Sequence, residues 1–98
     1  MSHHNVRSHT DLFTGIVARK IFSDLRKNDR NYLAGDSITY HEIIPVQLFN
    51  EEVIHFTGNK ISALISHVIT FEDYSRYLVG LEDHKDLVVL SIERIGLM

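Results

Sequence analysis

The run from Lys60 to Phe71 constrains the fold of this chain more than any other segment, because apolar residues fill most of it. They include Ile61, Ala63, Ile65, Val68 and Ile69, with Ser62, Ser66 and Thr70 interleaved. Such near-continuous apolarity predicts a β-strand that is covered on much of both faces. Any fold that the chain adopts has to bury this strand.

Several shorter segments also have strand-like patterns. They are Asn5 to Ser8, Ile21 to Leu25, Ser37 to Ile44, Leu48 to Phe56 and the β-branched closing run Leu87 to Ile92. Gly58-Asn59 is interpreted as a turn before the apolar strand. Five or six short strands with one early helix predict a mixed, β-rich α/β fold with a closed or nearly closed barrel. Residues 1–5 are expected to be a disordered tail, and residues 6–98 a single domain.

One helix is predicted near the N-terminus. Ser8 and Asp11 have the spacing of a capping box, and an apolar face follows them. This face consists of Leu12, Phe13, Ile16 and Val17. Gly15 lowers helix propensity and is interpreted as a position of close packing. The helix should end between Ala18 and Lys20.

The composition excludes several classes of protein. The chain has no cysteine, so disulfides, cysteine-ligated metals, iron–sulfur clusters and thiol catalysis are excluded. Its seven histidines share no ligand spacing, and neither a metal nor a cofactor is predicted. No apolar run has the length of a membrane span, so no membrane association is expected. The expected location is the cytoplasm.

Charge is distributed unevenly along the chain. Residues 1–30 carry six basic and three acidic side chains, whereas residues 31–98 carry four basic and ten acidic ones. The stretch from Arg26 to Asp36 concentrates basic residues in Arg26, Lys27 and Arg30, and it ends in the turn signal Gly35-Asp36. Arginine forks and lysine ammonium groups bind phosphate or carboxylate. The sequence therefore predicts an anion-binding site on this stretch.

The order of these residues resembles the ASCH domains of the PUA-like superfamily. The resemblance covers about residues 5–95 and rests on Lys20, Asp24, the sequence Arg26-Lys27-Asn28-Asp29-Arg30, Tyr32, Gly35-Asp36 and Glu42. It is closest to a small bacterial and phage subgroup of unknown function that carries this Arg-Lys-Asn-Asp-Arg motif.

This resemblance implies a small PUA-like β-barrel of five or six strands flanked by one or two helices, with a cleft between helix and barrel. It also implies binding of RNA or nucleotides. One ASCH branch hydrolyses the amide of acetylated cytidine with a Lys, a Thr and a Glu. This chain has Phe22 at the threonine position and Asp24 where the subgroup has glutamate, so only Ser23 is left as a nearby hydroxyl.

The favoured hypothesis is a binding module for RNA or a nucleotide. Its expected ligand-binding residues are Lys20, Asp24, Arg26, Lys27, Arg30, Tyr40 and Glu42, with Tyr32, Tyr40 or Phe22 as possible stacking surfaces for a base. The residues expected to shape the loop are Asn28, Asp29, Gly35 and Asp36.

Two alternatives remain open. One is an amidohydrolase acting on a modified nucleoside, with Lys20, Ser23 and Glu42 as candidate catalytic residues. The other is a protein-interaction accessory domain that uses an exposed apolar run from Ile43 to Phe49. An enzyme is less favoured than a binding module. The sequence leaves the oligomeric state open.

Arg26 carries the most specific expectation. It is predicted to lie between the carboxylates of Asp24 and Glu42 at the mouth of the cleft, with some donors left for a ligand.

Overall fold

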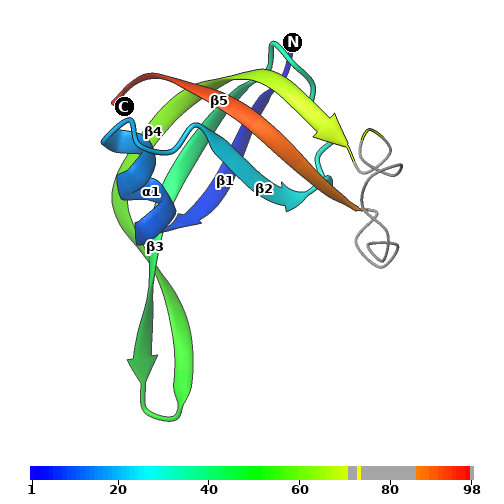
Figure 1. Ribbon diagram of the computed structural model, residues 1–98. Coiled ribbons are helices and arrows are strands. Elements are labelled where there is room, and N and C mark those ends of the chain that lie inside the picture. The colour runs from blue at the N-terminus through cyan, green and yellow to red at the C-terminus, as the bar shows by residue number, and fades with distance from the viewer. Residues whose placement is uncertain (71–72, 74–85, 98) are drawn as a thin grey trace.

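The structure is a computed structural model that describes residues 1–70, Asp73 and residues 86–97. Its elements are β1 (His3–His9), α1 (Thr10–Val17), β2 (Ser23–Lys27), β3 (Ser37–Leu48), β4 (Glu51–Thr70) and β5 (Leu87–Leu97), as Figure 1 shows. The polar stretch from Glu72 to Lys85 predicts a loop or a short helix, and it lies almost entirely outside the described residues. Among the described helical residues, no helix has the length and apolarity needed to cross a membrane.

The five strands form one mixed sheet in the order β1-β3-β4-β5-β2. β1 runs parallel to β3, and the other neighbouring pairs are antiparallel. The prediction of a small, β-rich domain with one helix is confirmed, but the sheet is not closed into a barrel. It curves strongly, yet β1 and β2 remain its two edges, and no strand ladder joins them within the described part of the chain (Figure 1).

The core lies on the concave face of this sheet. It contains fully buried Ile38, Tyr40, Ile61, Ala63, Ile65 and Leu90, together with Val6, Val88 and Ile92. α1 adds Phe13 and Ile16 to the same cluster, with Leu12 and Val17 partly buried beside them. The predicted apolar face of the helix and the two predicted central strands are thus confirmed.

The chain differs from the predicted element boundaries in the N-terminal tail and at the start of α1. The expected tail of residues 1–5 contains the start of β1, because the side chain of His4 is buried and the backbone N–H of Ser2 is bonded to Asp36. Ser8 does not cap the helix: the capping residue is His9, and the Ser8 hydroxyl donates to the His9 carbonyl. A Cβ atom at Gly15 would overlap Ile21, which confirms the close packing expected there.

β2 begins two residues later than predicted. Its polar side chain faces the core and its apolar side chain faces solvent, which is the reverse of the usual pattern. Asp24 is buried, whereas Leu25 is 64% exposed. The polar residue faces inward because it has partners there, which are described below.

β3 and β4 extend beyond the rest of the sheet as a two-stranded hairpin, visible below the body in Figure 1. We call residues 44–56 the arm. Its ladder runs from the pair Ile44 and His55 to the pair Leu48 and Glu51, around a tip at Phe49 and Asn50, and Ile43 pairs with Phe56 where the arm joins the body. The predicted turn at Gly58-Asn59 is wrong: β4 is continuous there, and Gly58, at φ +92°, lies in an irregularity where three residues of β4 face Glu42.

Candidate functional site

A buried polar cluster occupies the interior of the curved sheet. The Nε–H of Arg26 donates to the Oδ2 atom of Asp24 at 2.6 Å, and the Tyr40 hydroxyl donates to the same oxygen at 2.9 Å. β2 and β3 are not neighbours in the sheet, so this contact crosses the concave interior. Asp24 is 5% exposed and Tyr40 is fully buried. Desolvation, followed by the charge of Asp24, raises the pKa of Tyr40, so this hydroxyl remains a donor.

Arg26 also connects the two open edges of the sheet. Its Nη2 donates to the carbonyl oxygen of Arg7 in β1 at 3.1 Å, and its Cζ lies 5.7 Å from the centre of the Tyr40 ring. Burial by itself would lower the pKa of Arg26, but the charge and hydrogen bond of Asp24 and the nearby Tyr32 hydroxyl raise it. The guanidinium is therefore a fixed cation, and among the described residues no further partner takes up its remaining N–H groups.

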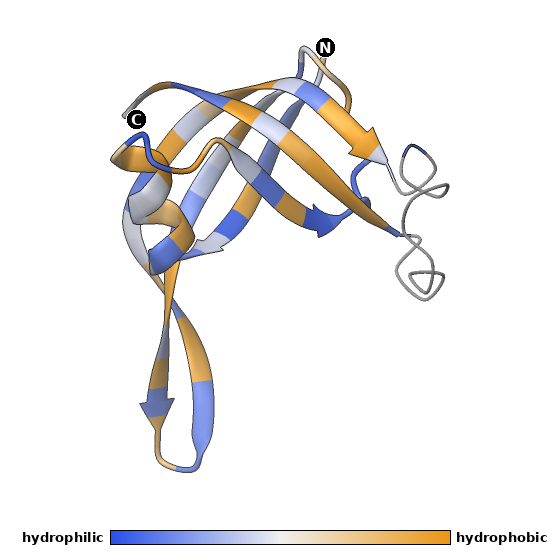
Figure 2. Ribbon diagram, in the orientation of Figure 1, coloured by the Kyte–Doolittle hydropathy of each residue, from blue (hydrophilic) through white to orange (hydrophobic). Residues whose placement is uncertain are grey.

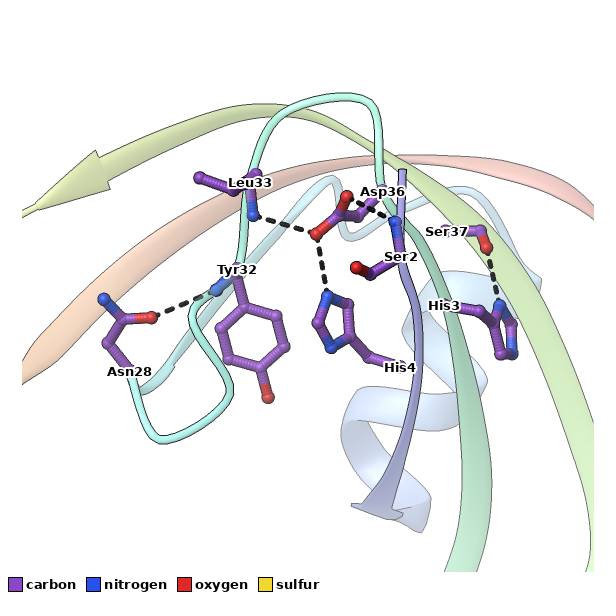
Figure 3. Close-up of polar contacts among 8 residues, drawn as sticks. All are labelled: Ser2, His3, His4, Asn28, Tyr32, Leu33, Asp36 and Ser37. Atoms are coloured by element: carbon purple, nitrogen blue, oxygen red, sulfur yellow. Dashed lines mark hydrogen bonds and ion pairs between the residues drawn. The ribbon is translucent and has the colours of Figure 1, made fainter.

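Tyr32 closes one side of this cluster. Its ring is 2% exposed and packs on the imidazole of His4, with ring centres 4.7 Å apart and planes inclined by 57°. Figure 3 shows the two rings next to each other. The Tyr32 hydroxyl is buried and has no hydrogen-bond partner among the described residues. The sequence suggested Tyr32 as one of three possible stacking surfaces for a base, whereas its ring belongs to the core.

The loop from residue 28 to residue 36 is fixed by side-chain hydrogen bonds, as predicted for Asn28 and Asp36. Asn28 Oδ1 accepts from the backbone N–H of Tyr32 at 3.2 Å. Asp36 accepts from the backbone N–H groups of Ser2 and Leu33, at 2.9 and 3.1 Å, and from His4 Nε2 at 2.8 Å (Figure 3). Asp36 therefore ties the N-terminus and the loop together, and this places Tyr32.

The other two predicted loop residues differ in what they do. Gly35 has φ +95°, a left-handed conformation that glycine adopts without strain, so the predicted turn is confirmed. Asp29 is exposed, and its side chain makes no hydrogen bond within the described part of the chain.

These contacts predict a specific pH dependence. The hydrogen bond from His4, then that from Ser2, lowers the pKa of Asp36 from 3.8 to about 2. Because the folded pKa is depressed, the contribution of Asp36 to stability is complete above pH 3.8 and is lost as the pH falls toward about 2. The urea midpoint of wild type should therefore fall more steeply over this window than that of Asp36→Asn. Asp29→Asn, on the same loop, is the matched control and should retain the wild-type slope. Equal slopes for wild type and Asp36→Asn would contradict this assignment.

Glu42 is not part of the polar cluster, so the predicted position of Arg26 between Asp24 and Glu42 is only half right. The Oε1 atom of Glu42 accepts from Thr57 Oγ1 at 2.8 Å and from Asn59 Nδ2 at 2.9 Å. These hydrogen bonds, first that of Asn59, lower its pKa. Glu42 thus fixes the base of the arm, where the β3–β4 ladder is irregular.

The remaining predicted residues lie on the surface. Lys20, Ser23, Lys27 and Arg30 are exposed. Thr10, at the start of α1, contributes to the lowered pKa of Glu42, whereas Lys20 follows the end of that helix. Eight helical residues span roughly 12 Å at 1.5 Å per residue. Lys20 and Glu42 therefore flank opposite ends of α1 and do not form an acid–base pair.

A surface hollow of about 200 Å³ lies where the end of α1 meets β5. Its lining consists of Ile16, Arg19, Ile21, Phe22, Ile92, Glu93 and Arg94. The Nη1 atom of Arg94 donates to the carbonyl oxygen of Val17 at 2.6 Å, and its Nε is buried without a partner among the described residues. Apart from Phe22, the sequence pattern indicated none of these residues as part of a site, because Arg94 is 75 positions from Arg19 and no local motif connects them.

Comparisons with known proteins agree with this fold. The family described as "Domain of unknown function (DUF3850)" matches residues 3–92. An uncharacterized 12.9 kDa protein in the GpA 3' region of Escherichia phage P2 is 32% identical over 71 residues, which is 72% of this chain and 58% of that protein. The crystal structure of hypothetical protein PH0355 has a TM-score of 0.57 to this chain at 14% identity, over 97% of this chain and all of the other. At that identity the similarity shows a shared fold alone.

Proposed function

This chain belongs to the DUF3850 family, and we propose that it is a binding module for single-stranded RNA or a nucleotide, with Arg26 as its central contact. The finer assignment of the chain to the ASCH group of the PUA-like superfamily is part of this proposal. The observation that supports it best is the fixed guanidinium of Arg26, which is held by Asp24 and by the Arg7 carbonyl and still has N–H groups to offer.

A guanidinium that is already oriented loses little conformational entropy when it binds an oxyanion, and it can bind bidentately. Lys27 and Arg30 are exposed on the residues that follow, where they would add phosphate contacts. Asp24 is neutralised by Arg26 and buried, so it does not repel an anion. The Tyr32 hydroxyl is buried but close enough to Arg26 to affect its pKa, and in this proposal it helps to orient the guanidinium toward the ligand.

Fluorescence anisotropy of short, labelled single-stranded RNA tests this proposal. Affinity should fall with salt, with a log–log slope of about −0.7 for each phosphate contact. The double variant Lys27→Gln/Arg30→Gln should have a shallower slope. A labelled mononucleotide, titrated in parallel, separates a nucleotide site from an RNA site. Absence of binding by both ligands at low salt would remove the proposal.

Two variants address the cluster itself. Arg26→Lys keeps the charge but loses the fork, and affinity should fall roughly tenfold, since a hydrogen bond to a charged group contributes about 1.5–3 kcal/mol. Tyr32→Phe removes a hydroxyl without a partner among the described residues, so affinity should fall while stability is unchanged or slightly higher. Lys60→Gln, an exposed cation at the base of the arm, is the control and should bind like wild type. If Arg26→Lys and Tyr32→Phe both bind with wild-type affinity, the binding site does not include this cluster.

The amidohydrolase alternative gains no support from the described residues, because Lys20 and Glu42 flank opposite ends of α1 and Glu42 holds Thr57 and Asn59. The protein-interaction alternative does gain a specific observation, which is the arm.

A further inference from the structure

The arm lacks the neighbours that stabilise the rest of the sheet. β1 accompanies β3 only as far as Ile43, and β5 accompanies β4 only from Ile61, so both edges of the arm are unpaired within the described structure. A two-stranded hairpin alone is marginally stable in water. The exposed apolar residues of the arm are Ile44, Leu48, Phe49, Val53, Ile54 and Phe56. Figure 2 shows apolar residues along both of its strands. Exposed apolar surface of this kind indicates a protein partner.

The tip of the arm has a distinctive chemistry. Phe49 is fully exposed and has φ +56°, a left-handed conformation that is uncommon for a phenylalanine. Glu51 and Glu52 follow it after Asn50, and both are exposed. The tip therefore presents an aromatic ring together with two carboxylates.

The hollow beside the end of α1 has the complementary chemistry. Its walls are apolar, formed by Ile16, Ile21 and Ile92 with the exposed ring of Phe22. Its cations are Arg19 and Arg94, against the single carboxylate of Glu93. A volume of about 200 Å³ is sufficient for a phenyl ring, since an apolar protein cavity of about 150 Å³ can hold benzene.

We propose that the tip of the arm of one copy docks in the hollow of a second copy of this chain. Phe49 enters the apolar hollow, and Glu51 and Glu52 pair with Arg19 and Arg94. The arm projects away from the body that carries the hollow, so the two cannot meet within one molecule (Figure 1). Both halves of the contact are present on every chain, and reciprocal exchange of arms would close a symmetric dimer. This inference does not depend on nucleic-acid binding.

Light scattering on the full chain over a concentration series tests the proposal. Wild type should be a dimer that dissociates on dilution. Phe49→Ser should weaken the dimer at least tenfold, and circular dichroism checks that its fold is retained. Lys60→Glu, a charge reversal outside the contact, should leave the dimer unchanged. A wild-type monomer at all concentrations would overturn the proposal and leave the arm to a different protein.

Charge-reversal complementation distinguishes this contact from arm-to-arm association. Glu51→Arg/Glu52→Arg and Arg19→Glu should each be monomeric alone, because like charges then face each other. Mixing the two variants should restore a heterodimer, because one of its two contacts pairs a wild-type tip with a wild-type hollow and the other pairs the two sets of reversed charges. Dimers that persist in either variant alone, or monomers in the mixture, would contradict the proposed contact.

Discussion

Arg26→Ala is expected to lower the free energy of unfolding by about 3–5 kcal/mol, because it leaves the buried carboxylate of Asp24 without its cation. The substitution also removes the side chain that connects the edge strands β1 and β2. Urea unfolding followed by circular dichroism measures the loss. Since a fifth of the Arg26 side chain is exposed, the value should lie toward the lower end of this range.

A double variant separates the buried charge from the lost packing. Asp24→Asn/Arg26→Met has no charge in the cluster, and the asparagine oxygen can still accept from the Tyr40 hydroxyl. Neutral replacement of a buried ion pair is often close to neutral in stability, so this protein should be markedly more stable than Arg26→Ala. If Arg26→Ala costs less than about 1 kcal/mol, the pair behaves as a surface salt bridge and Arg26 does not hold the sheet edges together.

The parts of the fold that follow a regular apolar pattern could be predicted from the sequence. The strand-forming residues from Lys60 onward and those from Leu87 to Ile92 form the central strands β4 and β5, and Phe13 and Ile16 anchor the helix. In these segments the hydrophobicity of each side chain is sufficient to determine whether it faces the core. The family and the phage relative are also consistent with the subgroup of unknown function that the Arg-Lys-Asn-Asp-Arg motif indicated.

The predictions that were wrong concern residues placed by distant partners. Asp24 faces inward because Arg26 and Tyr40 satisfy its carboxylate, which inverts the apolar pattern of β2. Gly58 marks an irregular ladder instead of a turn, because Glu42 holds Thr57 and Asn59 on either side of it. The sheet remains open because, in the part of the chain that the structure describes, β1 and β2 are joined by the Arg26 side chain and by no ladder.

For the candidate site, the sequence singled out Asp24, Arg26 and Tyr40, which do come together. It could not show that Tyr32 is packed on His4, because that contact depends on Asp36 tying the N-terminus to the loop. The basic motif predicted an anion-binding role for Arg26, Lys27 and Arg30, but their spacing gives no information on which of these three cations is fixed.

Ile16→Ala is expected to cost about 2–5 kcal/mol, because Ile16 is 1% exposed and packs in the core from a helix of eight residues. A helix this short does not persist in water without tertiary packing, so losing its main anchor should release much of α1. Urea unfolding gives the cost, and amide hydrogen exchange of Thr14 to Val17 shows whether the helix opens locally before the sheet unfolds.

Leu12→Ala is the matched control for Ile16→Ala, since it removes a similar side chain that is only partly buried on the same helix, and it should cost clearly less. Gly15 allows α1 to pack closely against Ile21, so the structure around Ile16 has little freedom to collapse into a cavity. The loss in free energy of unfolding for Ile16→Ala should therefore lie in the upper half of the expected range. An alternative anchor is the hydrogen bond from Arg94 to the Val17 carbonyl at the end of the helix. Suppose that Ile16→Ala and Leu12→Ala lower the free energy of unfolding by similar small amounts and leave amide hydrogen exchange in α1 unchanged. The helix would then be held by this hydrogen bond and not by packing in the core.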